Sequence, residues 1–326
     1  MTEDLSSKLF SSLSDSGIQG RIEDLVPLTG GASKEIWKFN LVDSTESTKM
    51  IFRRGAQGES SLAIKTADEA KIQEEVSKTG VSVPQIIFVS NDSKLGDSYV
   101  MKFIEGETIP RKILRDERFK SALPLLANQC GEEIAKIHNT PLDNLQFLPK
   151  KSSKALVEDL YLLYESYKQP SPVFEYAYRW LKEQDFGNFE DSLVHGDFRL
   201  GNILVNESGL NGIIDWELAH IGNPIEDLGW MCGNSWRFGN SQMVVGGFGN
   251  LEDLIAGYNN VSAEKINAEL IKTWQVFGTF RWGVICLMQV YAHLNETVNS
   301  VEKAAIGRRV SETEIDIVDL LLLGGK

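Results

Sequence analysis

The segment from Ser192 to Glu217 constrains the fold of this chain more than any other part of its sequence. It reads SLVHGDFRLGNILVNESGLNGIIDWE, in which short apolar runs alternate with turn residues and unlike polar groups. A strand that only filled a hydrophobic core would not need these groups at its ends. The polar residues that flank the apolar runs are His195, Asp197, Asn202, Asp215 and Glu217.

The apolar runs predict a β-hairpin with a polar open end. Residues 203–205 and 212–214 form its arms, and Ser208-Gly209 is a dipeptide that marks turns. Pairing about this turn places Asn202 opposite Asp215, at a separation of about 4.5 to 5.5 Å between facing residues. Two oxygen-bearing side chains at that separation can share a hard cation such as Mg²⁺.

The order of the acidic and amide residues repeats that of the protein-kinase catalytic loop. In that loop an Asp accepts the proton of the substrate hydroxyl, and an Asn and a later Asp hold the metal ions. Here Asp197 lies on the loop that leads to Asn202, and Asp215 follows the hairpin. Each residue alone is common in loops for turn chemistry, so the prediction depends on all three occurring in this order.

The charge balance limits the partners of the chain. It has 326 residues, of which 42% are hydrophobic, enough for one large or two medium domains. Its 33 Lys and Arg against 46 Asp and Glu give a net charge of -13, which disfavours nucleic acid and anionic membranes as partners. A basic cluster between Arg111 and Lys120 is diluted by acids and indicates a solvated helix face.

The cysteines and the N-terminal segment predict a cytoplasmic protein. Cys130, Cys232 and Cys286 are odd in number and form no CxxC pattern, so the sequence suggests neither a disulfide framework nor a zinc site. The first residues are acidic and serine-rich and lack an apolar signal core. The longest apolar run, near residues 284–292, is too short to span a bilayer.

A change of hydrophobic period along the chain predicts an α+β fold in two lobes. In the N-terminal part, strands are expected at 21–28, 35–42, 49–53, 86–89 and 98–104, with one charged helix at 60–78. Beyond about residue 119 the spacing is helical, with helices expected near 126–137, 156–167, 173–182, 274–294 and 312–323. We therefore expect a polar N-terminal lead-in over 1–20, a nucleotide-binding lobe over 21–104 and a helical lobe with the catalytic loop and acceptor site over 105–326, with the ligand between the lobes.

The residues His195 to Asn202, followed by Ile214-Asp215-Trp216-Glu217, resemble the signature of the aminoglycoside phosphotransferase and choline kinase-like family. Members of this family are small-molecule relatives of protein kinases. The resemblance implies a protein-kinase-like fold, with an N-terminal antiparallel β-sheet lobe that carries one main helix and a mostly helical C-terminal lobe. It also implies ATP and Mg²⁺ as cofactors, with Asp197 as catalytic base and Asn202 and Asp215 as Mg²⁺ ligands.

The same resemblance gives supporting roles to other polar residues of the region. His195 is expected to brace the loop by hydrogen bonds, and Asp227, in the pattern Pro224-x-x-Asp227-Leu228, to brace it in a similar way. Glu217 can reach a second ion or the acceptor, although solvent exposure beside the site explains it as well.

The N-terminal half contains a candidate phosphate-binding turn between its first two strands. Glycines there allow backbone N–H groups to approach phosphate oxygens closely, although an ordinary hairpin turn fits equally. The sequence has no GxxxxGK followed by Ser or Thr, and no GxGxxG after a strand, which excludes a P-loop and a Rossmann fold. The residues of the turn are Gly30, Gly31, Ala32 and Ser33.

A basic residue on the third strand occupies the place of the kinase lysine. The kinase pattern V-A-I-K carries Lys where this chain has Arg53, and similar members of the family carry Arg there. Arg binds phosphate well but differs from Lys in shape and hydration. On the following helix Glu69 is the expected ion-pair partner, with Glu74 and Glu75 as rivals.

The segment from Tyr99 to Phe103 resembles the connection between the two lobes of the family. In that role, backbone groups around Met101 and Phe103 would hydrogen-bond adenine. The periodicity of the segment is explained equally by a buried strand with no ligand.

The helical half permits several interpretations of the acceptor. Phe280-Arg281-Trp282-Gly283 and Ile306 to Glu314 resemble a subgroup that includes the kinase-like domains fused to acyl-CoA dehydrogenases. That subgroup suggests a hydroxy-acid or hydroxyacyl acceptor, with Arg281, Arg308 or Arg309 as partners of its carboxylate. The tryptophans instead suggest an aromatic cage for a quaternary ammonium such as choline, and the negative net charge permits a polycationic aminoglycoside.

Three classes of function remain open from the sequence. An ATP-dependent small-molecule kinase fits the motif best. A catalytically silent kinase-like binding module is the second, because Arg53 departs from the kinase lysine. The third is a metal-dependent hydrolase that uses His195, Asp197 and Asp215. The other histidines are scattered along the chain and offer no additional ligands near this motif, which argues against the hydrolase.

Overall fold

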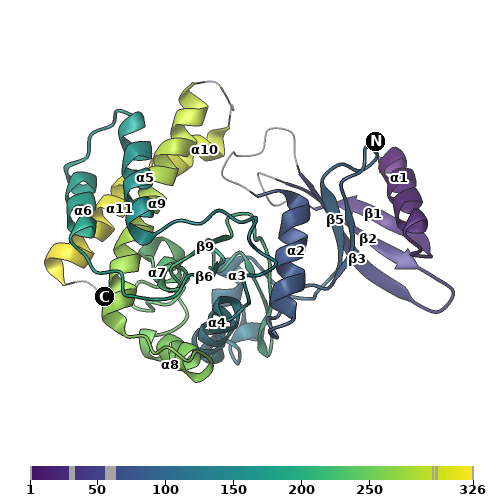
Figure 1. Cartoon of the computed structure of the whole chain (residues 1–326), viewed down its shortest axis with the longest axis horizontal. Coiled ribbons are helices and arrows are strands. Elements are labelled where there is room, and N and C mark those ends of the chain that lie inside the picture. Colours follow the sequence, from purple (N-terminus) through teal and green to yellow (C-terminus); the bar gives the residue numbers. More distant parts are fainter. Residues whose placement is uncertain (1, 29–33, 56–63, 296, 298–299, 325–326) are drawn as a thin grey trace.

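Alternating apolar residues in the N-terminal part fold into one antiparallel sheet with a helix on each face (Figure 1). The computed structural model describes residues 2–28, 34–55, 64–295, 297 and 300–324. The strands follow the order β1-β2-β3-β5-β4 across the sheet. Their bounds are β1 (Arg21–Pro27), β2 (Lys34–Val42), β3 (Ser47–Gly55), β4 (Ile86–Ser90) and β5 (Ser98–Lys102).

Successive residues of each strand point to opposite faces of this sheet. On β3, Met50 and Phe52 pack with the helix α1 (Thr2–Asp15), whereas Ile51 packs with the helix α2 (Thr66–Ser77). Figure 1 shows α1 and α2 on opposite sides of the sheet. An antiparallel sheet beside a helical part confirms the predicted α+β class.

The N-terminal segment, predicted as a polar lead-in over residues 1–20, contains the helix α1. Leu5, Leu9 and Leu13 recur every four residues along α1 and are buried against the sheet. This spacing places the three side chains on one helical stripe. Serines and acids surround these leucines and lower the mean hydropathy of the segment, so the sequence pattern did not indicate the helix.

The C-terminal part is mostly helical, with two short strand pairs that carry the predicted motif. No helix within the described ranges is long and apolar enough to cross a membrane. The strand pairs are β6 (Ser192–Val194) with β9 (His220–Gly222), and β7 (Ile203–Asn206) with β8 (Gly209–Ile213). The helices are α3 (Pro110–Arg115), α4 (Leu123–His138), α5 (Ser153–Ser166), α6 (Pro172–Lys182), α7 (Ile225–Met231), α8 (Leu251–Val261), α9 (Ala268–Leu294), α10 (Val301–Gly307) and α11 (Val310–Val318).

The helix α9 forms the centre of this part, and α6, α7, α10 and α11 pack against it. Gly229 allows α7 to approach α9 closely, since a Cβ atom at this position would lie 2.4 Å from the Cβ atom of Trp274. The short helix α7 is therefore held in a fixed place beside the strand pairs. It carries Asp227, one of the residues predicted to brace the catalytic loop.

The hairpin β7–β8 has a different register from the predicted one. Ile203 pairs with Ile213, and an irregularity between Leu204 and Val205 shifts the pairing near the turn. The shift arises because β8 starts at Gly209, so that β8 contributes one residue more than β7 within the ladder. As a result, Asn202 accepts a backbone hydrogen bond from Ile214 rather than facing Asp215, which follows at the end of the arm.

Candidate active site

The predicted catalytic loop joins β6 to β7 and is shaped by a glycine. Gly196 has a φ of +81°, and a Cβ atom at this position would lie 2.4 Å from the carbonyl oxygen of Leu218. Only glycine meets both conditions without strain. The loop therefore turns sharply and presents the next residue, Asp197, at the open end of the hairpin.

The carboxylate of Asp197 accepts hydrogen bonds from three side chains. Arg199 Nε and Trp230 Nε1 donate to Oδ1 at 2.9 Å and 2.8 Å. The amide nitrogen of Asn202 donates to Oδ2 at 2.6 Å and to the Asp197 carbonyl at 3.0 Å. These donors fix the orientation of a carboxylate that is only partly exposed to solvent.

The buried carboxylate of Asp227 holds the start of the loop. It accepts the backbone N–H groups of His195 at 2.8 Å and Gly196 at 2.9 Å, and His138 Nε2 lies 3.3 Å away. Burial raises the pKa of Asp227, but the hydrogen bond and charge of His138, together with the His195 backbone N–H, outweigh it and leave the pKa below its ordinary 3.8. Asp227 thus stays charged inside the protein and ties α7 to the loop.

The side chain of His195 bonds within the protein rather than facing the open site. Its Nδ1 accepts the backbone N–H of Asp197 at 3.2 Å, so Nε2 carries the proton and donates to the carbonyl of Ile214 at 3.2 Å. The ring also packs on Trp216, with centroids 4.6 Å apart. Through these contacts His195 connects the catalytic loop to the end of β8.

Asn202 and Asp215 have the donor atoms that a magnesium ion requires. The amide nitrogen of Asn202 is turned toward Asp197, so its carbonyl oxygen faces away from that residue. Asp215 has a φ of +71° and uses only Oδ1 in its contact with Arg53. One amide oxygen and one carboxylate oxygen suit Mg²⁺, which takes few protein ligands and fills its remaining positions with water and phosphate oxygens.

Arg53 connects the sheet to this site. Its Nη2 lies 2.5 Å from Asp215 Oδ1, and its Nε lies 3.2 Å from Glu69 Oε2 on α2. Burial raises the pKa of Asp215, but the charge and hydrogen bond of Arg53, together with the charges of His195 and Arg199, lower it, and the net pKa lies below 3.8. Of the three acids considered on α2, Glu69 is the one that pairs with Arg53, while Glu75 pairs with Lys78.

A second cation, which the sequence patterns did not reveal, shares Glu69 with Arg53. Lys34 at the start of β2 is buried, and its Nζ lies 3.3 Å from Glu69 Oε1 and 3.1 Å from Thr66 Oγ1. Burial raises the pKa of Glu69 to about 7, although both cations oppose this change. Lys34 directly follows the glycine-containing turn in the sequence. This position was the one feature of the sequence that could have indicated a role for Lys34 in the candidate site.

The family follows from a comparison with known proteins. Residues 24–261, well over half of the chain, match the model of the phosphotransferase enzyme family. The chain belongs to this family. The match begins in the sheet and extends to the end of α8, so it includes every predicted site residue except Arg281, Arg308 and Arg309.

Relatives and solved structures agree with this family. Acyl-CoA dehydrogenase family member 11 of Homo sapiens is 29% identical over 174 residues, which make up 49% of this chain and 22% of the relative. The chain thus spans about a fifth of that relative's length. A protein from Ralstonia eutropha described as an aminoglycoside phosphotransferase has a TM-score of 0.75 at 18% identity, with 98% of each chain covered. A choline/ethanolamine kinase family protein from Mesorhizobium loti has a TM-score of 0.61 at 17% identity, with 98% of this chain and 95% of that chain covered.

The segment of this phosphotransferase that is predicted to bind adenine lies at the end of β5 and directly after it. Met101 is buried on β5 between β3 and β4, and the backbone N–H of Phe103 donates to Lys49 at 3.0 Å. An adenine contact from Phe103 would therefore use its carbonyl oxygen. The predicted phosphate-binding turn, Gly30 to Ser33, lies outside the described residues.

Glu217 and Arg281, the two residues predicted to contact the acceptor substrate, make different contacts. The backbone carbonyl of Glu217 accepts the N–H of Ile64 at 3.0 Å, which joins the loop after β8 to the segment before α2. Arg281 Nη1 lies 3.1 Å from Glu226 Oε1, and its guanidinium stacks 4.9 Å from the ring of Trp230. Arg281 therefore contacts the same tryptophan that donates to Asp197.

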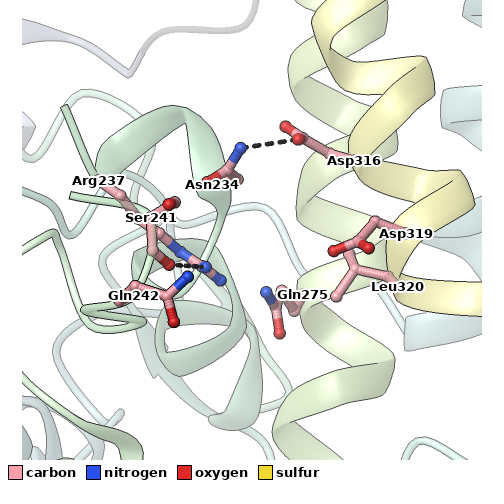
Figure 2. Close-up of a pocket in the computed structure, with 8 residues that line it drawn as sticks. All are labelled: Asn234, Arg237, Ser241, Gln242, Gln275, Asp316, Asp319 and Leu320. Atoms are coloured by element: carbon pink, nitrogen blue, oxygen red, sulfur yellow. Dashed lines mark hydrogen bonds between the residues drawn. The ribbon is translucent and has the colours of Figure 1, made fainter. Parts of the chain in front are cut away.

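A separate polar cavity of about 260 Å³ lies between the segment after α7 and the helices α9 and α11. Figure 2 shows Arg237 on one wall, Asp316 and Asp319 on the other and Gln275 beneath. Arg237 donates to the carbonyls of Cys232 at 3.1 Å and Ser241 at 2.7 Å, and so fixes the segment that carries it. None of the predicted site residues is among the described residues that line this cavity.

Proposed function

We propose that this protein transfers the γ-phosphoryl group of ATP to a hydroxyl group of a small molecule, with Mg²⁺ as cofactor. The observation that carries the proposal is the arrangement of Asp197, Asn202 and Asp215 around one end of the β7–β8 hairpin, with Arg53 reaching Asp215 from the sheet. Membership of the phosphotransferase enzyme family supports the reaction class.

Each residue has a defined task in this reaction. Asp197 orients the acceptor hydroxyl and takes its proton as the hydroxyl oxygen bonds to the γ-phosphorus. The bond from the γ-phosphorus to the bridging oxygen breaks, and its electron pair leaves with ADP. A bound Mg²⁺, held by Asn202 and Asp215, would offset the negative charge of the phosphates.

Arg53 is suited to hold the phosphates of the nucleotide. Its guanidinium is positioned from behind by Glu69, which is itself paired with Lys34. A planar guanidinium can bind two oxygens at once, so Arg53 can exchange its contact with Asp215 for phosphate oxygens when the nucleotide binds. This arrangement favours an active kinase over a catalytically silent module.

The acceptor we favour is a hydroxy acid or a hydroxyacyl compound. Three arginines stack on a group of mutually packed tryptophans beside Asp197: Arg199 on Trp236 at 4.6 Å, Arg281 on Trp230 at 4.9 Å and Arg309 on Trp282 at 5.5 Å. Each guanidinium pairs with a carboxylate of the protein, namely Asp197, Glu226 or Glu312. An acceptor carboxylate can exchange for such a partner, which suits an acidic acceptor better than an ammonium group. The likeness to acyl-CoA dehydrogenase family member 11 supports the same class.

The experiment is a screen for acceptor-dependent ADP release with MgATP. The panel contains the isomers of hydroxybutyrate, their CoA thioesters, choline and an aminoglycoside. We expect release with a hydroxy acid or its thioester; release only with choline or the aminoglycoside would move the proposal to that acceptor class. If no member of the panel causes ADP release and MgATP does not stabilise the protein, the kinase function is contradicted.

The variant Asp197→Ala separates binding from transfer. We expect MgATP to raise the melting temperature of this variant as much as that of the wild type, because a ligand bound only to the folded state stabilises it by mass action. Phosphate transfer should fall by a factor of about 100 to 10,000, the usual contribution of a general base. Undiminished turnover in the variant would show that Asp197 is not the base.

A further inference from the structure

One of the donors to Asp197 comes from outside the catalytic loop. Trp230 lies on α7, 33 residues further along the chain, and its indole N–H donates to Asp197 Oδ1 at 2.8 Å. The side chain is 3% exposed, so water does not compete for this bond. An indole N–H is a donor only and never accepts a proton, and it therefore presents the same group to Asp197 throughout a reaction.

The packing around Trp230 fixes the position of its ring. The ring packs against Trp236 at a centroid distance of 5.1 Å and against the guanidinium of Arg281 at 4.9 Å. On α9, Gly278 leaves just enough room, because a Cβ atom there would lie 3.3 Å from Cε3 of the indole. A rigid ring in a tight site can hold its N–H in one direction.

The distribution of donors distinguishes the two oxygens of Asp197. Oδ1 accepts from both Arg199 and Trp230, whereas Oδ2 accepts from Asn202. A carboxylate has about two acceptor sites on each oxygen. The two donors thus fill Oδ1, and one acceptor position remains on Oδ2.

We propose that Trp230 is a positioning residue, whose indole N–H holds Asp197 so that Oδ2 is the oxygen that takes the proton of the acceptor hydroxyl. This inference rests on the proposed kinase function. The hydroxyl O–H bond breaks, its proton moves to Oδ2 and its oxygen bonds to the γ-phosphorus, while the electron pair of the broken phosphoanhydride bond leaves on ADP. Without the indole N–H, Oδ1 has a vacant acceptor site and the carboxylate can rotate away from the hydroxyl.

The test compares Trp230→Phe with the matched control Trp274→Phe. Trp274 is also buried, and its indole N–H has no hydrogen-bond partner within the part of the chain that the structure describes. Both changes remove the same atoms from the core, but only the first removes a bond to Asp197. The measurements are kcat, KM for ATP and the melting temperature with and without MgATP, with the best acceptor of the screen.

We expect Trp230→Phe to lower kcat by about 10- to 100-fold, because small displacements of a reacting group have effects of this size. The KM for ATP and the stabilisation by MgATP should stay within about twofold of wild type, since in the proposed reaction Asp197 contacts the acceptor hydroxyl and not the nucleotide. Trp274→Phe should lower the melting temperature by a similar amount but leave kcat within about twofold. A lower kcat with an unchanged KM for ATP in Trp230→Phe is not expected from a loss of stability alone.

A second variant covers the case in which Trp230→Phe does not fold. Gly278→Ala keeps the indole N–H but pushes a methyl group against the ring, and alanine is favoured over glycine within a helix. We expect a folded protein whose kcat falls by less than that of Trp230→Phe, with an unchanged KM for ATP.

Two results would overturn the inference. Wild-type kcat in Trp230→Phe, or in Gly278→Ala where the first variant is unfolded, would show that the bond does not position the base. An equal fall of kcat in Trp230→Phe and Trp274→Phe would assign a purely structural role to Trp230. Undiminished turnover in Asp197→Ala is a different failure, because it would contradict the proposed base itself.

Discussion

At the scale of single residues, the buried carboxylate of Asp227 connects three parts of the site. It is 0% exposed and receives N–H groups from His195, Gly196 and His138. Because its pKa in the folded protein lies below the ordinary 3.8, it favours folding at every pH above that value. Its contribution is lost as the pH falls below about 3.8 and the carboxylate becomes protonated.

The lowered pKa of Asp227 predicts a pH-dependent effect for the variant Asp227→Asn. At pH 7 we expect the free energy of unfolding to fall by about 3 to 5 kcal/mol, because buried donors lose a charged acceptor. The difference from wild type should become smaller at pH 3, because below about 3.8 the wild type progressively loses the same contribution. Urea denaturation at both pH values measures it, with the exposed Asp143→Asn as control. A difference that stays constant between the two pH values would contradict the assignment.

The sequence allowed the prediction that some residues of the candidate site lie close together, because these residues are near one another in the chain. Asp197, Asn202 and Asp215 lie within one hairpin and its flanks, so their order along the chain already brings them together. Lys34 and Trp230 could not be predicted in this way. Lys34 reaches Glu69 only once β2 and α2 pack together, and Trp230 reaches Asp197 only once α7 rests on α9.

At the scale of elements, hydrophobic period predicted the strands well and α1 not at all. Each of the five strands of the sheet lies within a few residues of its predicted range, because short apolar runs bounded by turn residues mark them in the sequence. The register of the β7–β8 hairpin was wrong because an irregularity within a ladder leaves no signal in the apolar pattern. The leucines of α1 recur at helical spacing in the sequence, but the polar residues between them obscure this pattern, and the sheet face that buries them comes from later parts of the chain.

The burial of α1 predicts unequal effects for two adjacent residues. Leu9 is 0% exposed and packs against the sheet, whereas Phe10 is 49% exposed. We expect Leu9→Ala to lower the free energy of unfolding by about 2 to 5 kcal/mol and Phe10→Ala to change it by less than about 0.5 kcal/mol. Urea denaturation of both variants measures the difference. Equal effects would mean that α1 does not pack on the sheet in solution.

At the scale of the whole molecule, the candidate site lies where the sheet meets the helical part. Arg53 on β3 contacts Asp215, and the backbone N–H of Ile64 donates to the carbonyl of Glu217. A second backbone bond joins Ile213 to the carbonyl of Ser82 at 2.8 Å. The sheet therefore supplies the residues suited to a nucleotide, and the helical part supplies those suited to the metal ion and the proton.

The proposed kinase reaction requires Asn202 and Asp215 to bind one divalent ion beside Asp197. Diffraction from crystals grown with Mn²⁺ and a non-hydrolysable ATP analogue can locate this ion, because Mn²⁺ gives an anomalous signal that the carbon, nitrogen and oxygen atoms of the protein do not give. We predict a peak bonded to the side-chain oxygen of Asn202 and to a carboxylate oxygen of Asp215, with the terminal phosphate facing Asp197. A bound nucleotide whose metal ion touches neither residue would contradict the proposed site.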